Sequence, residues 1–307
     1  MTRFTLPGLT AAPFTPLHPD GALNLDAIPV YAALLAAQGV RGAFVNGTTG
    51  EGASLTTEER KRVAEAWRHA APAGLAVIVH VGHNALGDCL DLARHAAVIG
   101  CDAIAALAPS FFKPAGAAGL ADFCAPIAAA APALPFYYYH MPAMTGFHCS
   151  VADFLVLAEA RIPNLAGVKF THEDLLDFGL SRQACGGKFD LLHGRDETLL
   201  CGLALGATGA VGSTYNYAAR LYLDVTAAFG RGDLAAARAA QFRAQRFIAT
   251  LVRHGGGVVG GKAIMKMCGL DCGPVRAPLE ALAPDAARAL TQQLRAQGFF
   301  DFAAQVA

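Results

Sequence analysis

The sequence has few charged residues and no excess of either sign of charge. Charged side chains make up only 16% of the 307 residues, and 24 lysines and arginines balance 24 aspartates and glutamates. Without net charge, the chain as a whole would not attract nucleic acid or an anionic membrane, so neither is expected as a partner. We therefore expect a small-molecule ligand, recognised by a few residues at one local site.

Long apolar runs are also missing, although 54% of the residues are hydrophobic. The N-terminal segment is interrupted by Pro7 and Pro13, so it is unlike a secretory signal, and a cytoplasmic location is expected. The alanine-rich stretch 117–133 is broken by one aspartate and two prolines. It therefore offers no span of the roughly 20 apolar residues that a membrane helix needs.

The eight cysteines form no CxxC pair and have no histidine pair nearby at zinc-finger spacing. We expect them to be reduced and to serve as small apolar side chains. The close pair Cys268 and Cys272 is the one candidate for redox activity.

What the sequence does contain is a regular alternation of short β-like runs and amphipathic stretches, typical of parallel strands joined by helices. Eight units favour a closed (β/α)8 barrel of the α/β class over a doubly wound open sheet. The open sheet usually has fewer units and a GxGxxG turn after its first strand, where this chain has AAPFTP. The predicted strands cover residues 9–14, 42–46, 76–81, 103–107, 135–140, 166–171, 189–193 and 208–212.

The barrel is predicted to occupy residues 1–230, and a helical extension is predicted over residues 231–307. No low-complexity linker separates the two, so the extension should pack on the barrel. Apolar residues at helical spacing and an interruption at the glycines 255–257 predict its helices over 233–254, 262–268 and 284–297.

Two helix starts support this division of the chain. Thr56 with Glu59 forms a T-x-x-E capping box after the second strand, and Ser150 with Asp153 forms a similar pattern after the fifth.

Lys169 is the strongest candidate nucleophile, because it alone of the six lysines lies within a strand-like apolar run. Burial disfavours the ammonium form, lowers the pKa from about 10.4 and leaves an amine able to attack a carbonyl carbon. The structural alternative is a lysine that extends from a strand end to solvent or pairs with a carboxylate.

Alternation along the strand places Gly167, Lys169 and Thr171 on one face, which at the carboxyl end of a barrel strand faces the mouth of the lumen. On the preceding strand Tyr137 and Tyr139 share a face, and Tyr139 lies at the depth of Lys169. Tyr139 could transfer a proton, whereas Tyr137 is expected to pack in the core.

Loops at three predicted strand ends carry groups suited to an oxygen-rich ligand. The segment NGTTGEG offers backbone N–H groups and the hydroxyls of Thr48 and Thr49 to a carboxylate, although such turns are also common connectors. Asp196 and Glu197 could accept hydrogen bonds from sugar hydroxyls or simply favour a helix N-terminus. The loop after the eighth strand could bind phosphate, or a substrate hydroxyl through Ser213.

At these residues the sequence resembles the superfamily of pyruvate-dependent class I aldolases that contains dihydrodipicolinate synthase and N-acetylneuraminate lyase, and it is more similar to the lyases. The match extends from about Thr10 to the C-terminal helices. Each motif alone is weak, but their order and their places at strand ends are together specific. The motifs are VNGTTGEG (45–52), YYYHMPAMTG (137–146), GVKFTHEDLLDFG (167–179), GRDE (194–197) and GATGAVGSTYNY (206–217).

The resemblance implies a Schiff-base aldolase that reversibly cleaves N-acetylneuraminate, a sialic acid, to pyruvate and N-acetylmannosamine, with no metal or organic cofactor. It implies that Lys169 forms the imine, that Tyr139 transfers the proton, and that Thr48 and Thr49 bind the pyruvate carboxylate. The residues that would line the sugar side are Thr171, Gly194, Asp196, Glu197 and Ser213.

Two positions bear on substrate and assembly. Met144 stands where dihydrodipicolinate synthases that resemble this chain have an arginine, which argues for a sugar without a second carboxylate. Phe111 and Phe112 stand where many relatives have a tyrosine pair that serves a neighbouring subunit, and phenylalanine cannot relay protons. The resemblance also implies a homotetramer, in which exposed apolar residues of this kind would be covered.

Two alternatives stay open at this point. One is a related aldolase that acts on a shorter 2-keto-3-deoxy sugar acid. The other is a non-catalytic protein that binds 2-oxo acids or sialic acid.

Overall fold

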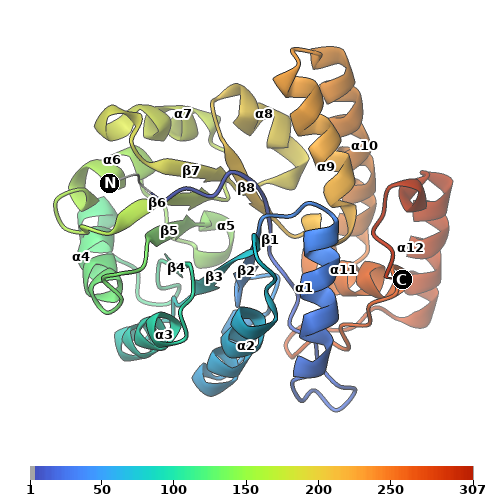
Figure 1. Ribbon diagram of the computed structural model, residues 1–307, viewed down its shortest axis with the longest axis horizontal. Coiled ribbons are helices and arrows are strands. Elements are labelled where there is room, and N and C mark those ends of the chain that lie inside the picture. The colour runs from blue at the N-terminus through green and yellow to red at the C-terminus, as the bar shows by residue number, and fades with distance from the viewer. Residues whose placement is uncertain (1–3, 307) are drawn as a thin grey trace.

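Eight parallel strands close into one barrel in the computed structural model, which describes residues 4–306 (Figure 1). Each strand pairs with the next along the chain, and β8 closes on β1. The predicted (β/α)8 class is therefore confirmed. The strands are β1 (Gly8–Ala11), β2 (Gly42–Val45), β3 (Ala76–His80), β4 (Ala103–Leu107), β5 (Phe136–His140), β6 (Leu165–Phe170), β7 (Asp190–His193) and β8 (Gly209–Gly212).

The observed strands fall within three residues of the predicted boundaries. The largest difference is at β1, which ends at Ala11 and not at Phe14. Pro13 explains the difference, since proline has no N–H to donate to a neighbouring strand.

Helices surround the barrel on all sides of its wall (Figure 1). The α-helices are α1 (Ile28–Ala37), α2 (Thr57–Ala70), α3 (Leu86–Val98), α4 (Gly116–Ala129), α5 (Pro142–Thr145), α6 (Val151–Ala158), α7 (Leu175–Gln183), α8 (Leu199–Ala204), α9 (Tyr215–Gly230), α10 (Leu234–Arg253), α11 (Gly256–Met267) and α12 (Pro284–Ala296). Short 3-10 helices are η1 (Leu25–Ala27), η2 (Gly52–Ser54), η3 (Ala184–Gly187), η4 (Asp196–Thr198) and η5 (Phe299–Asp301).

The helix starts agree with the sequence signals, with one change of partner. Thr56 and Glu59 form the complete capping box of α2. Ser150 accepts from the backbone N–H of Asp153 as predicted, but the carboxylate at this helix start belongs to Asp177 of α7, which accepts from Val151 N at 2.9 Å. A side chain distant in sequence thus occupies the place that the local pattern gave to Asp153.

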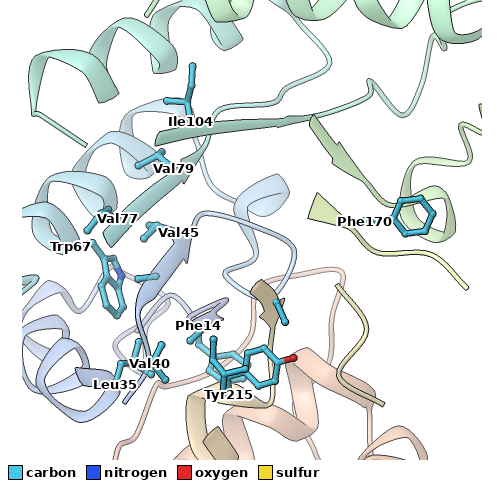
Figure 2. Close-up of a cluster of buried hydrophobic side chains, with 14 of the residues drawn as sticks. Phe14, Leu35, Val40, Val45, Trp67, Val77, Val79, Ile104, Phe170 and Tyr215 are labelled. Carbon is cyan, nitrogen blue, oxygen red and sulfur yellow. The ribbon is translucent and has the colours of Figure 1, made fainter. Parts of the chain in front are cut away.

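The apolar residues form two layers separated by the strands. Side chains that point out of the barrel pack against the helices, and Figure 2 shows part of this layer, with Val45 and Val77 near Trp67 of α2 and Val79 near Ile104 of β4. The second layer fills the lumen and includes Phe44, Ile78, Ala105, Tyr137, Tyr139, Leu192 and Val211. This inner layer surrounds the base of the candidate site.

The C-terminal helices gather on one side of the barrel, drawn in orange to red in Figure 1. The predicted helices over 233–254 and 284–297 agree closely with α10 and α12, whereas α11 begins at Gly256, six residues before the predicted start at 262. Residues 1–3 and 307, at the ends of the two predicted domain ranges, lie outside the described part of the chain.

Between residues 4 and 306 no helix is long and apolar enough to cross a membrane. All eight cysteines are free thiols, and Cys268 and Cys272 are buried. Burial raises the pKa of both thiols to about 12, which makes them unreactive at neutral pH.

Candidate active site

Lys169 projects from β6 into the lumen, where it is only 3% exposed. The register between β5 and β6 pairs it with Tyr139, as strand alternation predicted. Its Nζ lies 3.9 Å from the ring centroid of Tyr139 and 3.9 Å from that of Phe44. The amine therefore lies between two aromatic rings, with little water to stabilise its charge.

This environment lowers the pKa of Lys169 to about 7, because burial disfavours the ammonium, while the negative charge of Asp196 acts in the opposite direction. A substantial fraction of the amine is then neutral at physiological pH. A neutral amine is the form that can attack a carbonyl carbon.

A second lysine, Lys262 of α11, is also buried, and its contacts differ from those of Lys169. Its Nζ lies 2.7 Å from Glu51 Oε1 and donates to Pro274 O at 2.6 Å. Within residues 4–306, by contrast, no carboxylate lies within ion-pair distance of Lys169. Lys262 is therefore engaged in an ion pair and a backbone hydrogen bond, whereas Lys169 has no carboxylate partner of this kind among the described residues.

Tyr139 brings a phenol to the same end of the barrel. Its hydroxyl lies 3.3 Å from Thr48 Oγ1 and donates to Met141 Sδ at 2.9 Å. Burial raises the pKa of Tyr139 to about 12, so the phenol stays protonated near neutral pH. A protonated phenol that contacts a second hydroxyl can pass a proton in either direction.

The Thr48–Thr49 loop has a strained backbone at both ends. Asn46 and Glu51 have positive φ angles of 61° and 55°, values that few non-glycine residues adopt. Gly52 permits the tight turn, since a Cβ there would lie 2.0 Å from Asn46 O. The turn presents the two threonines together at the cavity.

Two residues that the sequence analysis did not identify, Arg60 and His80, support this loop. Asn46 Nδ2 donates to Arg60 O at 2.8 Å, and His80 Nδ1 lies 3.2 Å from Asn46 O. Arg60 is 1% exposed and donates to the carbonyl of His80 at 2.6 Å and to that of Gly82 at 3.0 Å. Burial and the Arg60 charge lower the pKa of His80 well below its usual value, so the imidazole is neutral.

His80 could have been found from the sequence, because it lies near the carboxyl end of the strand predicted over 76–81, on the same face as Ile78. Arg60 could not, because one arginine among the charged residues of an amphipathic helix gives no sign of burial.

On the opposite side of the cavity, Asp196 begins η4 and is only 5% exposed. Its Oδ2 accepts from Thr214 N at 2.8 Å and from Thr214 Oγ1 at 2.7 Å. Burial and, to a smaller extent, the neighbouring Glu197 raise the pKa of Asp196 to about 6, against the lowering effect of the Thr214 bonds and of Lys169.

Two glycines make room for these polar groups. A Cβ at Gly194 would lie 2.0 Å from Thr171 Oγ1, and a Cβ at Gly212 would lie 1.7 Å from Asp196 Oδ1. Glycine is therefore required at both positions if the hydroxyl and the carboxylate are to keep their places.

Glu197 is less buried and belongs to an ion-pair chain at the rim. The guanidinium of Arg195 lies 2.8 Å from Glu197 and 2.6 Å from Glu173. These two ion pairs hold the Glu197 carboxylate beside the cavity.

The structure brings all of the predicted site residues to one cavity of about 260 Å³. Met144 also lines it, as do Met141 and Thr214, which the sequence analysis did not single out. The predicted residues at this cavity are Thr48, Thr49, Tyr139, Lys169, Thr171, Gly194, Asp196, Glu197 and Ser213. Among the described residues, no group of three or more His, Cys, Asp or Glu side chains could hold a metal ion.

A closed barrel that holds an unpaired buried lysine beside a phenol and two adjacent hydroxyls, at the carboxyl ends of its strands, defines a class of protein. It is a (β/α)8 barrel equipped to form an imine with a carbonyl compound. The chain belongs to the dihydrodipicolinate synthetase family, whose model matches residues 5–297.

Within this family the chain is similar to sialic acid lyases. It is 45% identical over 301 residues to N-acetylneuraminate lyase of Rattus norvegicus, covering 97% of this chain and 94% of that protein. The solved Proteus mirabilis N-acetylneuraminate lyase has a TM-score of 0.93 and 42% identity, over 96% of this chain and all of that one. A catalytic lysine mutant of the Ruminococcus gnavus sialic acid aldolase has a TM-score of 0.90 and 30% identity, over 97% of this chain and 98% of that one.

Proposed function

We propose that this protein is a Schiff-base aldolase that cleaves N-acetylneuraminate reversibly to pyruvate and N-acetylmannosamine. The observation that carries the proposal is Lys169, which is buried without a carboxylate partner, has a pKa of about 7 and faces Tyr139. The chain is 45% identical to a mammalian N-acetylneuraminate lyase over nearly its whole length, which supports N-acetylneuraminate as the substrate.

The reaction follows from the electron demand of an imine. Neutral Lys169 adds to the C2 carbonyl of the open-chain keto acid, and loss of water gives a protonated imine. Removal of the C4 hydroxyl proton breaks the C3–C4 bond, and its electron pair moves toward the imine nitrogen to give an enamine. N-Acetylmannosamine leaves as the aldehyde, C3 is protonated, and water hydrolyses the imine to pyruvate and free Lys169.

Tyr139, in contact with Thr48, is placed to relay the C4 hydroxyl proton: as the phenol takes this proton, it gives its own to the carboxylate of the bound keto acid. The carboxylate proton then returns through the same phenol to C3 of the enamine. In this proposal the hydroxyls and backbone N–H groups of Thr48 and Thr49 bind the carboxylate of the keto acid. The sugar side of the cavity is formed by Thr171, Gly194, Asp196, Glu197 and Ser213.

Met144, 61% exposed at the mouth of the cavity, is the residue that bears on substrate choice. A neutral thioether there supports a sugar acid with a single carboxylate. The rate of pyruvate release from sialic acid, compared with that from shorter 2-keto-3-deoxy sugar acids, distinguishes the two substrate classes. Tight binding of sialic acid without turnover would instead indicate a non-catalytic binding protein.

Borohydride reduction in the presence of pyruvate tests the nucleophile. We expect peptide mass spectrometry to find a reduced pyruvyl group on Lys169, with Lys262 unmodified, because Lys262 is buried but paired with Glu51. An unmodified Lys169, or modification only at another lysine, would overturn the assignment.

We also propose a cytoplasmic homotetramer in which each chain consists of a barrel, residues 1–230, and a C-terminal helical extension, residues 231–307, that packs on the barrel. Phe111 and Phe112 support the assembly, because 77% and 84% of these side chains are exposed in the single chain. Sedimentation velocity of the purified protein measures the oligomeric state directly.

A further inference from the structure

The carboxylate of Asp196 has two oxygens with different surroundings. Oδ2 accepts two hydrogen bonds from Thr214, one from the backbone and one from the hydroxyl. Oδ1 is buried and has no hydrogen bond of normal geometry among the described residues, although the Tyr215 side chain also acts on this carboxylate, and Asp196 lines the cavity. The carboxylate therefore has one oxygen engaged with the protein and one buried oxygen whose hydrogen-bonding capacity is unused.

A buried phenol completes the arrangement around Oδ2. The hydroxyl of Tyr222, a fully buried residue of α9, lies 2.7 Å from Thr214 Oγ1. The single hydroxyl proton of Thr214 must go to the ionised carboxylate, which can only accept. The Tyr222 hydroxyl must then donate to Thr214 Oγ1, so the three groups form one directed chain from Tyr222 to Asp196.

The rest of the surroundings fixes Asp196 from the other sides. Gln241 of α10 donates to Asp196 O at 3.1 Å and accepts from Leu200 N at 2.9 Å. Gly212 leaves room for Oδ1 where any larger residue would collide with it. The orientation of the carboxylate is thus set by residues that do not line the cavity, Tyr222 and Gln241, together with Thr214, which does.

We propose that Tyr222 acts through Thr214 as a positioning residue, which holds Asp196 so that Oδ1 faces a hydroxyl of the sugar substrate. The inference rests on the proposed aldolase function and deepens it, because it names what sets the polar contact on the sugar side. Pyruvate, which occupies only the Lys169 end, does not need this contact.

The hydrogen bonds from Tyr222 through Thr214 also affect the pKa of Asp196. The Thr214 hydrogen bonds lower the pKa of this carboxyl, which burial and Glu197 raise to about 6. Loss of the Tyr222 hydroxyl weakens the bond from Thr214, so the pKa of Asp196 should rise. The other titratable groups that act on Asp196, or on which Asp196 acts, are Lys169 of β6, Tyr139 of β5, and Tyr215 and Tyr217 of α9.

Tyr222→Phe tests the proposal, and Tyr217→Phe is its matched control. Tyr217 lies on the same helix and is equally buried, but its hydroxyl has no hydrogen-bond partner among the described residues. We expect Tyr222→Phe to lower kcat/KM for sialic acid by about three- to tenfold, the effect of one hydrogen bond, and to move the acid limb of its pH profile upward. Borohydride trapping of pyruvate should be unchanged in both variants, and Tyr217→Phe should cleave sialic acid like the parent.

A double variant tests whether Tyr222 acts through Thr214. Thr214→Val should lower kcat/KM at least as far as Tyr222→Phe, and adding Tyr222→Phe should then have no further effect. If the two substitutions instead lowered kcat/KM independently, so that their effects multiplied, Tyr222 would not act through Thr214. A Tyr222→Phe variant that cleaves sialic acid like Tyr217→Phe, or that loses pyruvate trapping in parallel with cleavage, would also overturn the proposal. If the parent protein itself does not cleave sialic acid, the proposed function fails, whereas a cleaving parent with a neutral Tyr222→Phe variant refutes the positioning role alone.

Discussion

At the scale of single residues, the chemistry depends on the protonation of Lys169. The pKa of its ammonium lies near 7 because burial between two aromatic rings disfavours the charge. Imine formation with pyruvate should therefore rise with pH through about 7 and level off above it. At pH 5 the neutral fraction is about a hundredfold below the plateau. The rate of imine formation is measured by adding borohydride at timed intervals, at each pH across this range, and determining the fraction of protein that carries the reduced pyruvyl group.

The Asp196 charge raises the pKa of Lys169, so Asp196→Asn should move the midpoint of this curve to lower pH. A midpoint that stays near the ordinary lysine value of about 10.4 in the parent protein would show that the amine is solvated.

The second prediction at this scale concerns Tyr139. Tyr139→Phe keeps the ring against Lys169 and removes the hydroxyl that contacts Thr48. We expect pyruvate trapping to persist while kcat for sialic acid cleavage falls by about 10² to 10⁴, the usual contribution of a positioned acid–base group. Near-normal cleavage by this variant would remove Tyr139 from proton transfer.

Single residues also show what could and could not be predicted from sequence. Lys169 and Tyr139 could be predicted, because strand alternation gives both the face and the depth of a side chain. The contact between Tyr222 and Thr214 could not, since eight residues of regular helix would hold the two about 12 Å apart, and α9 is interrupted between them at Ala218. Arg60 is likewise buried by tertiary packing, which no local pattern records.

At the scale of elements, the loop between β2 and α2 shows how backbone geometry places functional groups. Gly52→Ala would put a Cβ 2.0 Å from Asn46 O, so the loop must shift and carry Thr48 and Thr49 with it. We expect the pyruvate concentration for half-maximal trapping to rise at least tenfold, a change on the order of one lost charge-assisted hydrogen bond.

Gly87→Ala serves as the control for this change. Gly87 lies in α3, and a Cβ there meets nothing within 4 Å. Alanine should leave trapping unchanged and stabilise the helix by about 0.5–1 kcal/mol. If both variants trapped pyruvate like the parent, the loop would not set carboxylate binding.

Helices could be predicted where short sequence patterns mark them. The residues at which they begin and end could be predicted less well. The capping box at Thr56 appears as the sequence indicated, and the helix predicted over 233–254 begins at Leu234, with Asp233 as its N-cap. The start of α11 was predicted too late, because the helix begins with two glycines, followed by two valines and two more glycines, and glycine has low helix propensity. Packing of this turn against the cavity, where Gly257 and Val258 lie, stabilises a helix that propensity alone would not.

At the scale of the whole molecule, one buried ion pair joins the C-terminal extension to the loop that carries Thr48 and Thr49. Glu51 ends that loop, and its carboxylate binds Lys262 of α11 and accepts from Arg276 N at 2.7 Å. Arg276 in turn forms two bonds to the carboxylate of Glu59 in α2. The extension is thereby tied to the barrel at the edge of the candidate site.

Removing one partner of a buried pair leaves an uncompensated charge in the interior, so Lys262→Met or Glu51→Gln alone should reduce the free energy of unfolding by about 3–5 kcal/mol. The double variant should lose clearly less than the sum, since neither charge is then unpaired. Lys266 and Asp271 form a matched control, because Lys266 lies on the same helix as Lys262 and its Nζ lies 2.7 Å from Asp271, but the two side chains are 69% and 54% exposed. Breaking that pair should cost no more than about 1 kcal/mol. Urea unfolding measures all of these values, and additive losses at Glu51 and Lys262 would mean that the extension is not coupled to the loop through this pair.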